Sequence, residues 1–347
     1  MHSDFSSIGR LRIHITPADV GKRVSVRQLA EIVDGHPTFT DTVGVLASWD
    51  IGVVCVTRRD GRTVRIAERA LVAGKVVPPA PVRRGGVPDA TADELEEVAA
   101  RAWPPLESER LGGWTLRAAA AEVPGGPAGG PPRREGFTKR ANSVLAVGDP
   151  GVPLDEALER VAAWYGERGL PVYVQLPDTS PYAAELDARG WSRESPTLVR
   201  TAPLAPLAVL AEEPGLPGQP EQPEFTFSRT PDAAWMAAYH RTGALAELAA
   251  RVMTGGPSVW FAAAPGVIGR AVVDGRWTHF GAVEVAPEQR RRGLATAVMA
   301  ALARRAREEG ATAAHLQVEA DNPGARALYE RLGFTDHHGY HYRRPPV

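Results

Sequence analysis

The residues of this sequence that are best suited to chemistry form a basic, glycine-containing turn near the carboxyl terminus. The turn reads Arg290, Arg291, Arg292, Gly293, Leu294, Ala295 and Thr296. From Leu294 onward an apolar residue recurs at every fourth position as far as Ala306, which predicts an amphipathic helix. The turn thus enters a helix amino terminus, where unpaired N–H groups and the positive end of the helix dipole favour a phosphate. Gly293 leaves the backbone open to close approach, and the arginines can add charge-assisted contacts.

Predicted strands lie on both sides of this turn and its helix. The apolar run Phe280–Val285 ends at Pro287, which fits the length and the stop of a strand. A second apolar run, His315–Val318, predicts another strand after the helix. A further segment then contains Asn322, Pro323, Ala325, Leu328, Tyr329, Glu330, Gly333 and Phe334.

Two motifs, in this order and at this separation, resemble the GCN5-related N-acetyltransferases. Arg290-x-x-Gly293-x-Ala295 resembles the Q/R-x-x-G-x-G/A pyrophosphate loop of that family. The segment from Asn322 to Phe334 resembles its N-x-x-A-x-x-x-Y-x-x-x-G-F motif. The resemblance spans roughly residues 225–344 and is most specific over 277–334. It implies acetyl-CoA as the acyl donor, held in a V-shaped gap between two neighbouring parallel strands.

The resemblance also implies roles for individual residues. Backbone groups of Val283 and Val285 would pair with the pantetheine arm of the donor, and Asn322 would contact that arm from the other side. Ala325 is also expected to bind the donor. The amides from Arg291 to Thr296, next to Arg290, would hold the pyrophosphate. Tyr329 would lie near the thioester sulfur and protonate the leaving thiolate, a task that suits an oxygen acid.

The general base is less well defined by the sequence. An amine must be neutral to attack, and His279 stands where some family members carry a catalytic glutamate; its ordinary pKa is near neutrality. Strand alternation would place His279 on one face with Gly281, Val283 and Val285, and Glu284 on the other. Glu284 and Glu319 are alternative bases, and deprotonation through water would need no single base.

Composition sets broad limits on the rest of the chain. With 347 residues we expect two or three domains, and a formal net charge of -1 gives no general attraction to nucleic acid or membrane. The single cysteine, Cys55, lies in an apolar run and is expected to be a small core residue of a cytoplasmic protein. No apolar run is long enough for a signal core or a membrane span, and the histidines show no zinc spacing, so no metal is expected.

Residues 1–80 read as several short strands, which predict a small β-barrel that resembles SH3- or Tudor-like modules. Asp60-Gly61, between two apolar runs, predicts a hairpin within Arg58–Arg62. The prolines from Pro78 onward predict a linker. No chemistry is visible in this segment.

Residues 90–202 predict a second domain whose order of strands and helices repeats that of the carboxyl-terminal one. GDPGVP stands in place of the basic turn, and Leu186 stands in place of Tyr329, so this copy is interpreted as degenerate. Arg140, Asn142 and Ser143 are polar within a predicted strand over Phe137–Val147 and either face a substrate or mark an edge strand. A proline-rich linker is predicted at 203–223.

Residues 224–347 are then the predicted catalytic domain. By analogy with the family, its first helices would line the acceptor side, with Trp235, Tyr239 and Arg251 as candidate contacts. The expected fold class is α+β, with a mixed sheet flanked by helices in two copies after the barrel. The leading hypothesis is direct acetyl transfer from acetyl-CoA to a primary amine in a ternary complex, because no cysteine stands near the site to carry an acyl group.

Two other functions compete with this hypothesis. A sensor that binds acetyl-CoA without turnover would need the turn but not Tyr329. A nucleic-acid module is disfavoured by the near-zero charge and by the lack of aromatic residues among Arg290–Arg292. The acceptor, a small molecule or a protein, is left open, as is the choice between monomer and homodimer.

Overall fold

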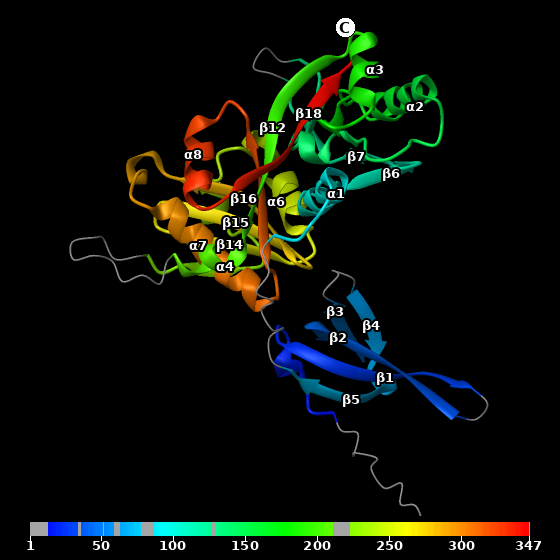
Figure 1. Cartoon of the computed structure of the whole chain (residues 1–347), viewed down its shortest axis with the longest axis vertical. Helices are drawn as coiled ribbons and strands as arrows, with labels where there is room; N and C mark the ends of the chain where they lie inside the picture. The colour runs from blue at the N-terminus through cyan, green and yellow to red at the C-terminus, as the bar shows by residue number, and fades with distance from the viewer. Residues whose placement is uncertain are drawn as a thin grey trace, which may run out of the picture. The chain divides into compact units, whose positions relative to one another are not determined.

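The computed structural model of the chain describes residues 13–33, 36–50, 52–58, 63–77, 87–125, 130–210 and 223–346. It divides into two compact units, one made mostly of residues 1–83 and the other of nearly all the rest (Figure 1). Within the described residues, no helix is both long enough and apolar enough to cross a membrane.

The amino-terminal unit is a five-stranded antiparallel sheet in the order β4-β3-β2-β1-β5. Its strands are β1 (Arg23–Val33), β2 (His36–Asp50), β3 (Val53–Arg58), β4 (Thr63–Ala67) and β5 (Leu71–Val76). Alternate residues such as Val24, Leu46 and Val56 are fully buried on one face and form a core of their own. Cys55 is half-buried on β3 and lies outside that core, contrary to the expectation.

Several short strands were predicted here, but the barrel itself is not confirmed. Among the described residues, β4 and β5 stay at the two edges and no pairing joins them. The predicted hairpin residues 59–62 and the start of the predicted linker, 78–86, lie outside the described residues.

The second unit is built on an eleven-stranded sheet in the order β13-β14-β15-β16-β17-β12-β18-β11-β10-β7-β6. Its strands are β6 (Glu107–Leu111), β7 (Trp114–Ala118), β10 (Val144–Leu145), β11 (Val174–Pro177), β12 (Ser192–Pro203), β13 (Thr226–Ser228), β14 (Val259–Ala264), β15 (Val267–Asp274), β16 (Trp277–Val285), β17 (Ala313–Glu319) and β18 (Thr335–Arg344). Residues 90–202 and 224–347 therefore share one sheet. The sequence analysis had predicted two domains here, and these segments do not form two separate compact units.

The last strands of the two segments are exchanged at the middle of this sheet. β12 ends the first segment but pairs antiparallel with β17 of the second, from Thr197↔Glu319 to Pro203↔Ala313. β18 ends the second segment but pairs antiparallel with β11 of the first, from Val174↔Arg343 to Pro177↔Tyr340. β12 and β18 also pair with each other, so each segment completes the sheet of the other.

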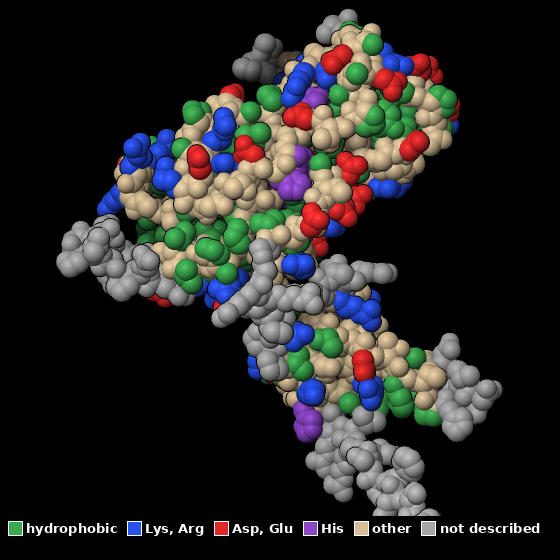
Figure 2. All heavy atoms as spheres, viewed as in Figure 1, with side chains coloured by type: hydrophobic (Ala, Val, Ile, Leu, Met, Phe, Trp, Pro, Cys, Tyr) green, Lys and Arg blue, Asp and Glu red, His purple; other side chains and the backbone are tan. Residues whose placement is uncertain are grey.

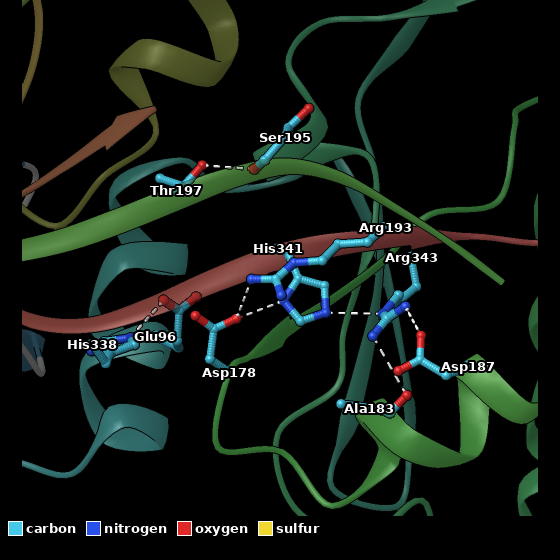
Figure 3. A network of polar contacts seen from close by, with 10 residues as sticks. All are labelled: Glu96, Asp178, Ala183, Asp187, Arg193, Ser195, Thr197, His338, His341 and Arg343. Atoms are coloured by element: carbon cyan, nitrogen blue, oxygen red, sulfur yellow. Dashed lines mark hydrogen bonds and ion pairs between the residues drawn. The ribbon is translucent and has the colours of Figure 1, made fainter. Parts of the chain in front are cut away.

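Polar side chains fix β18 in this position (Figure 3). His341 Nδ1 lies 2.7 Å from Asp178 Oδ1, and Arg343 Nε donates to His341 Nε2 at 2.9 Å. Arg343 also pairs with Asp187 of the helix α3 (Tyr182–Ala188). His338 Nε2 lies 2.9 Å from Glu96 of the helix α1 (Ala92–Ala102), which Thr91 caps through a capping box. These contacts attach the last strand to elements of the first segment.

Helices cover both faces of the second segment's strands. On one face α7 (Leu294–Glu308) and α8 (Pro323–Arg331) pack against a core that contains Phe280, Leu302 and Leu316. On the other face α1, α5 (Ala233–Ala238) and α6 (Ala246–Thr254) pack against a core that contains Phe261 and Ile268. In the first segment α2 (Leu154–Glu167) and α3 pack on a third core around Trp114 and Leu176.

Two predictions about irregular parts of the chain are wrong. The predicted linker 203–223 begins with a short helix, α4 (Leu204–Val209), whose Leu204, Leu207 and Ala208 are fully buried in the core under α7. Residues 211–222 of that linker lie outside the described residues. The predicted strand Phe137–Val147 is a 3-10 turn, Lys139–Ala141, followed by the two-residue strand β10. Before it, β8 (Ala120–Val123) and β9 (Arg133–Gly136) pair as a ribbon.

Candidate functional site

β16 and β17 part at the point where the sequence predicts a donor site. They pair in parallel from Trp277↔Ala313 to Phe280↔Leu316, although β16 continues to Val285 and β17 to Glu319. Each strand keeps its outer neighbour over this stretch. The amide of Ala286 donates to Gly266 O beside β15 at 2.9 Å, and Gln317 and Val318 stay paired with β12. Backbone groups on the inner edges of Gly281–Val285 and Gln317–Glu319 are therefore left for another partner, apart from Val285 O, which accepts from Arg290.

A bulge in β16 changes the face of the sheet to which the side chains after it point. Ala282 has a φ of 50°, an uncommon left-handed conformation for a residue with a side chain. Val283 and Val285 consequently pack toward the core under α7, as Phe280 does, whereas Ala282 packs toward the α1–α6 side. The predicted grouping of His279 with Val283 and Val285 on one face is thus wrong. Glu284 lies on the same side as His279.

The turn before α7 has the open backbone that an anion site requires. Arg291 and Gly293 have φ values of 64° and 80°, and a Cβ on Gly293 would meet no atom within 4 Å. Arg290 Nε donates to Val285 O at 3.2 Å and Arg292 Nη1 to Gln289 Oε1 at 2.6 Å, so two of the three exposed arginines brace the turn. Leu294, Ala295 and Thr296 are half-buried in the first turn of the helix, where amides have no helical partner. Figure 2 shows Lys and Arg side chains gathered on the surface over this end of α7.

α8 places the second motif beside the same strands. Asn322 caps the helix, with Oδ1 accepting from the amide of Ala325 at 3.0 Å, so this oxygen is engaged in holding the helix. Tyr329 is half-buried against Phe334, with ring centroids 5.9 Å apart. Burial raises the pKa of the Tyr329 phenol, and the positive charge of Arg241 opposes that rise. The phenol is therefore protonated at neutral pH.

His279 does not fit the role of general base. Its ring is 2% exposed, and its Nε2 accepts a hydrogen bond from Trp103 Nε1 at 3.0 Å. It also packs against His315 on the neighbouring strand, with ring centroids 4.8 Å apart. Burial, with the nearby His315 and Arg270, holds its pKa well below 6.5. A buried ring whose Nε2 is already occupied is poorly placed to take a proton from a substrate.

Glu284 is the carboxylate that β16 presents beside the parted strands. Its side chain is 21% exposed, and Oε2 lies 3.1 Å from His240 Nδ1. Arg241 Nε is 3.7 Å from Oε1. The sequence analysis did not identify His240 or Arg241, which follow α5 and carry no motif. Glu319, the other alternative base, is exposed at the end of β17.

The polar residues of the first segment divide into two groups. Asn142 and Ser143 are buried and bond to backbone groups of their own segment, so they are structural. Arg140 reaches the second segment, and its Nε donates to Gln317 Oε1 at 2.6 Å. Among the expected acceptor contacts, Trp235 is buried with its Nε1 bonded to Ala262 O, whereas Arg251 is exposed on α6. Tyr239 is nearly buried, and both Glu284 and Arg140 influence its pKa, which burial raises.

A separate pocket of about 470 Å³ lies in the first segment, where β10 and β11 end. It is lined by Asp93, Gly148, Asp149, Ser180 and Tyr182 among others, with no Lys or Arg side chain. It lies at the ends of β10 and β11, just as the candidate donor site lies where β16 and β17 part. Two carboxylates make it unsuitable for a pyrophosphate.

Comparisons with known proteins show what the sequence and the fold of this chain are similar to. A family profile described as "Probable histone acetyltransferase Rv0428c C-terminal" matches residues 90–343. The Mycobacterium tuberculosis protein "Probable histone acetyltransferase Rv0428c" is 30% identical over 336 residues, which cover 93% of this chain and 94% of that protein. The Bacillus subtilis protein "Uncharacterized N-acetyltransferase YobR" is 25% identical over 268 residues, which cover 72% of this chain and 97% of that protein. A GCN5-related N-acetyltransferase from Kribbella flavida, a solved structure, is 18% identical with a TM-score of 0.49, covering 74% of this chain and 96% of that one.

The sheet, the basic turn before α7 and the family match together define a GCN5-related acetyltransferase. Within that class, the chain belongs to the family of the probable histone acetyltransferase Rv0428c. Among the described residues, no group of three or more His, Cys, Asp or Glu side chains is arranged to hold a metal ion.

Proposed function

We propose that the protein transfers an acetyl group from acetyl-CoA directly to a primary amine in a ternary complex. The parting of β16 and β17 next to the open amino terminus of α7 carries this proposal. The inner backbone edges of Val283 and Val285 would bind the pantetheine arm as an added strand does. The amides of Arg291–Thr296 and the three arginines would bind the pyrophosphate.

Tyr329 and Glu284 are the proposed acid and base. The neutral amine attacks the thioester carbonyl carbon, the C–S bond breaks, and Tyr329 donates its proton to the leaving thiolate. Glu284 accepts the proton lost by the amine, directly or through one water. The raised pKa of Tyr329 keeps its proton available at neutral pH, and the half-buried position of Glu284 leaves it within reach of an acceptor. This assignment replaces His279 by one of the alternatives that the sequence had offered.

We also propose that the second unit arose as two copies of one acetyltransferase fold that have exchanged their last strands. The order of the sheet supports this, because, apart from the edge strand β13, four strands lead from each end to the exchanged pair β12 and β18, and the inner two of each four are parallel. Leu186, where the first copy should carry the acid, is fully buried, and the neighbouring pocket is acidic. The first copy would then hold no acetyl-CoA and would serve the site of the second.

A release assay tests the proposed function. Free thiol is measured from acetyl-CoA in the presence of a panel of primary amines, and each acetylated product is identified by mass. Turnover with at least one amine is expected. Binding of acetyl-CoA without acetylation of any amine would leave a donor-binding protein as the function. The cytoplasmic location and the choice between monomer and homodimer stay predictions.

A further inference from the structure

One side chain of the first segment enters the site of the second. Arg140 donates through Nε to Gln317, the first residue of β17 beyond its pairing with β16. The centre of its guanidinium lies 5.7 Å from the ring of Trp103, the residue that also bonds His279. Arg140 therefore stands on the same side of the sheet as Glu284, at the point where the strands part.

The backbone before Arg140 is held in a strained conformation. Thr138 has a φ of 56°, which is unfavourable for a β-branched residue and persists only where surroundings enforce it. Asn142 supplies that enforcement, since its Nδ2 donates to Phe137 O at 2.8 Å and to Thr138 O at 3.0 Å. A Cβ on Gly136 would lie 2.6 Å from Asn142, so the glycine is needed for this packing. These contacts hold the backbone before Arg140 in one conformation.

The charge around Arg140 is not balanced by the protein. Among the described residues no carboxylate pairs with Arg140, and the partner of its Nε is the neutral amide of Gln317. Arg270, 4.8 Å from the same Trp103 ring, is fully buried and bonds to the carbonyls of Met253 and Ala102, while its Nη1 has no partner. Arg241 lies beside Glu284. Arg140 and Arg241 are thus the two guanidinium groups that lie beside Glu284 on this side of the sheet, with Arg270 buried behind them.

We infer that the amine acceptor carries a carboxylate, which Arg140 binds while Glu284 receives the amine. This inference rests on the proposed function and names its substrate class, a small amino acid. Arg140 suits that task because a guanidinium binds a carboxylate through two parallel hydrogen bonds, and a fixed guanidinium sets the distance to the reacting amine. A lysine within a basic protein segment would meet the like charges of Arg140 and Arg241 instead. Tyr340 and Tyr239 also lie near the Arg140 guanidinium.

The test compares amino acids with their carboxamides, which keep the amine and lose the charge. The wild-type full chain is expected to use the carboxylate about ten- to hundred-fold better in kcat/KM, the range for a charged hydrogen-bonded pair. Arg140→Gln should lose this preference mainly through a higher KM, and Arg140→Lys should restore part of it. Lys139→Gln, the same change of charge one residue away, should keep the preference. Acetyl-CoA affinity should stay constant in all four proteins.

Several outcomes would overturn the inference. One is equal use of acid and amide by the wild type, and another is a preference for a lysine-rich peptide. An equal fall of kcat for both acceptors in Arg140→Gln would mean that Arg140 stabilises the reacting carbonyl and not the acceptor. Failure to acetylate any amine, with acetyl-CoA still bound, would contradict the proposed function itself and the inference with it.

Discussion

Tyr329 and Glu284 approach the parted strands from the two faces of the sheet, and Arg241 acts on both. Tyr329 packs with the core under α8, whereas Glu284 points to the side of α1 and α5, where Arg241 Nε lies 3.7 Å from its Oε1. The same arginine lowers the pKa of Tyr329 against the rise caused by burial. Arg241 therefore lies close enough to influence both the proposed acid and the proposed base, which belong to different elements.

Tyr329→Phe is expected to leave acetyl-CoA affinity unchanged and to reduce kcat by about a hundred-fold. The reason is that the phenol contributes a proton in the transition state, and general acids supply rate factors of this order. Calorimetry gives the affinity and the release assay gives kcat. Equal turnover by the variant and the wild type would remove Tyr329 from the mechanism.

Glu284→Gln is expected to reduce kcat by a similar factor, about a hundred-fold, because the amide cannot accept the proton of the amine. Glu288→Gln, an exposed carboxylate in the 3-10 turn Pro287–Gln289, is the matched control and should keep full activity. The comparison should be made at pH 7 and again at pH 9. Recovery of the variant at the higher pH, where more acceptor is already neutral, would support the assignment. A variant as active as the control at both pH values would exclude Glu284.

The paired histidines of β16 and β17 predict a dependence of stability on pH. Burial lowers the pKa of His279 well below 6.5 and that of His315 to about 3. Below pH 6.5 the unfolded chain binds protons that the folded chain does not, so the free energy of unfolding falls as the pH drops toward 3, by up to about 1.4 kcal/mol per pH unit and histidine. His315→Leu should remove the contribution of one histidine to this dependence, measured as the free energy of unfolding in urea titrations between pH 7.5 and 5. An unchanged slope would contradict the burial of an uncharged His315.

At the scale of elements, local patterns predicted the second segment well. Apolar runs and the helical period after Leu294 were enough for β16, β17 and α7, because each buries one face at a regular period. The bulge at Ala282 was missed because alanine gives no sign of a positive φ, and that single residue reversed the faces of Val283 and Val285. The short helix α4 was missed because its flanking prolines read as a linker. Arg140 was noticed, but its contact with Gln317 depends on the joining of two segments.

The strand exchange could not be read from the sequence, since β12 and β18 each follow a glycine turn and would fit beside either segment.

The strand exchange has a consequence for truncated proteins. A chain that ends at Phe334 lacks β18, which leaves β11 and β12 without their shared neighbour. We expect this truncation to unfold the first segment as well as the second, seen as loss of one cooperative thermal transition in circular dichroism. A first segment that remains folded would show that the exchange is not needed for its stability.

At the scale of the whole molecule, the chain comprises two compact units with separate cores. The composition predicted more than one domain, but it could not show that residues 90–202 and 224–347 would share a sheet.

The amino-terminal unit contributes none of the residues assigned to the donor site. A chain that starts at Val87 is therefore expected to bind acetyl-CoA with the affinity of the full chain. A loss of affinity greater than about ten-fold would show that the first unit takes part in donor binding.

The most direct test of the account is a calorimetric titration of acetyl-CoA into the full chain and into Gly293→Glu. The wild type should bind one equivalent, and the variant should bind none, since its carboxylate would face the pyrophosphate at the start of α7. Gly169→Glu is the matched control, because Gly169 is also exposed, has a φ of 61° and has no atom within 4 Å of its Cβ position. That control should bind as the wild type does. Two equivalents in the wild type, or unchanged binding by Gly293→Glu, would contradict a single donor site at the parting of β16 and β17.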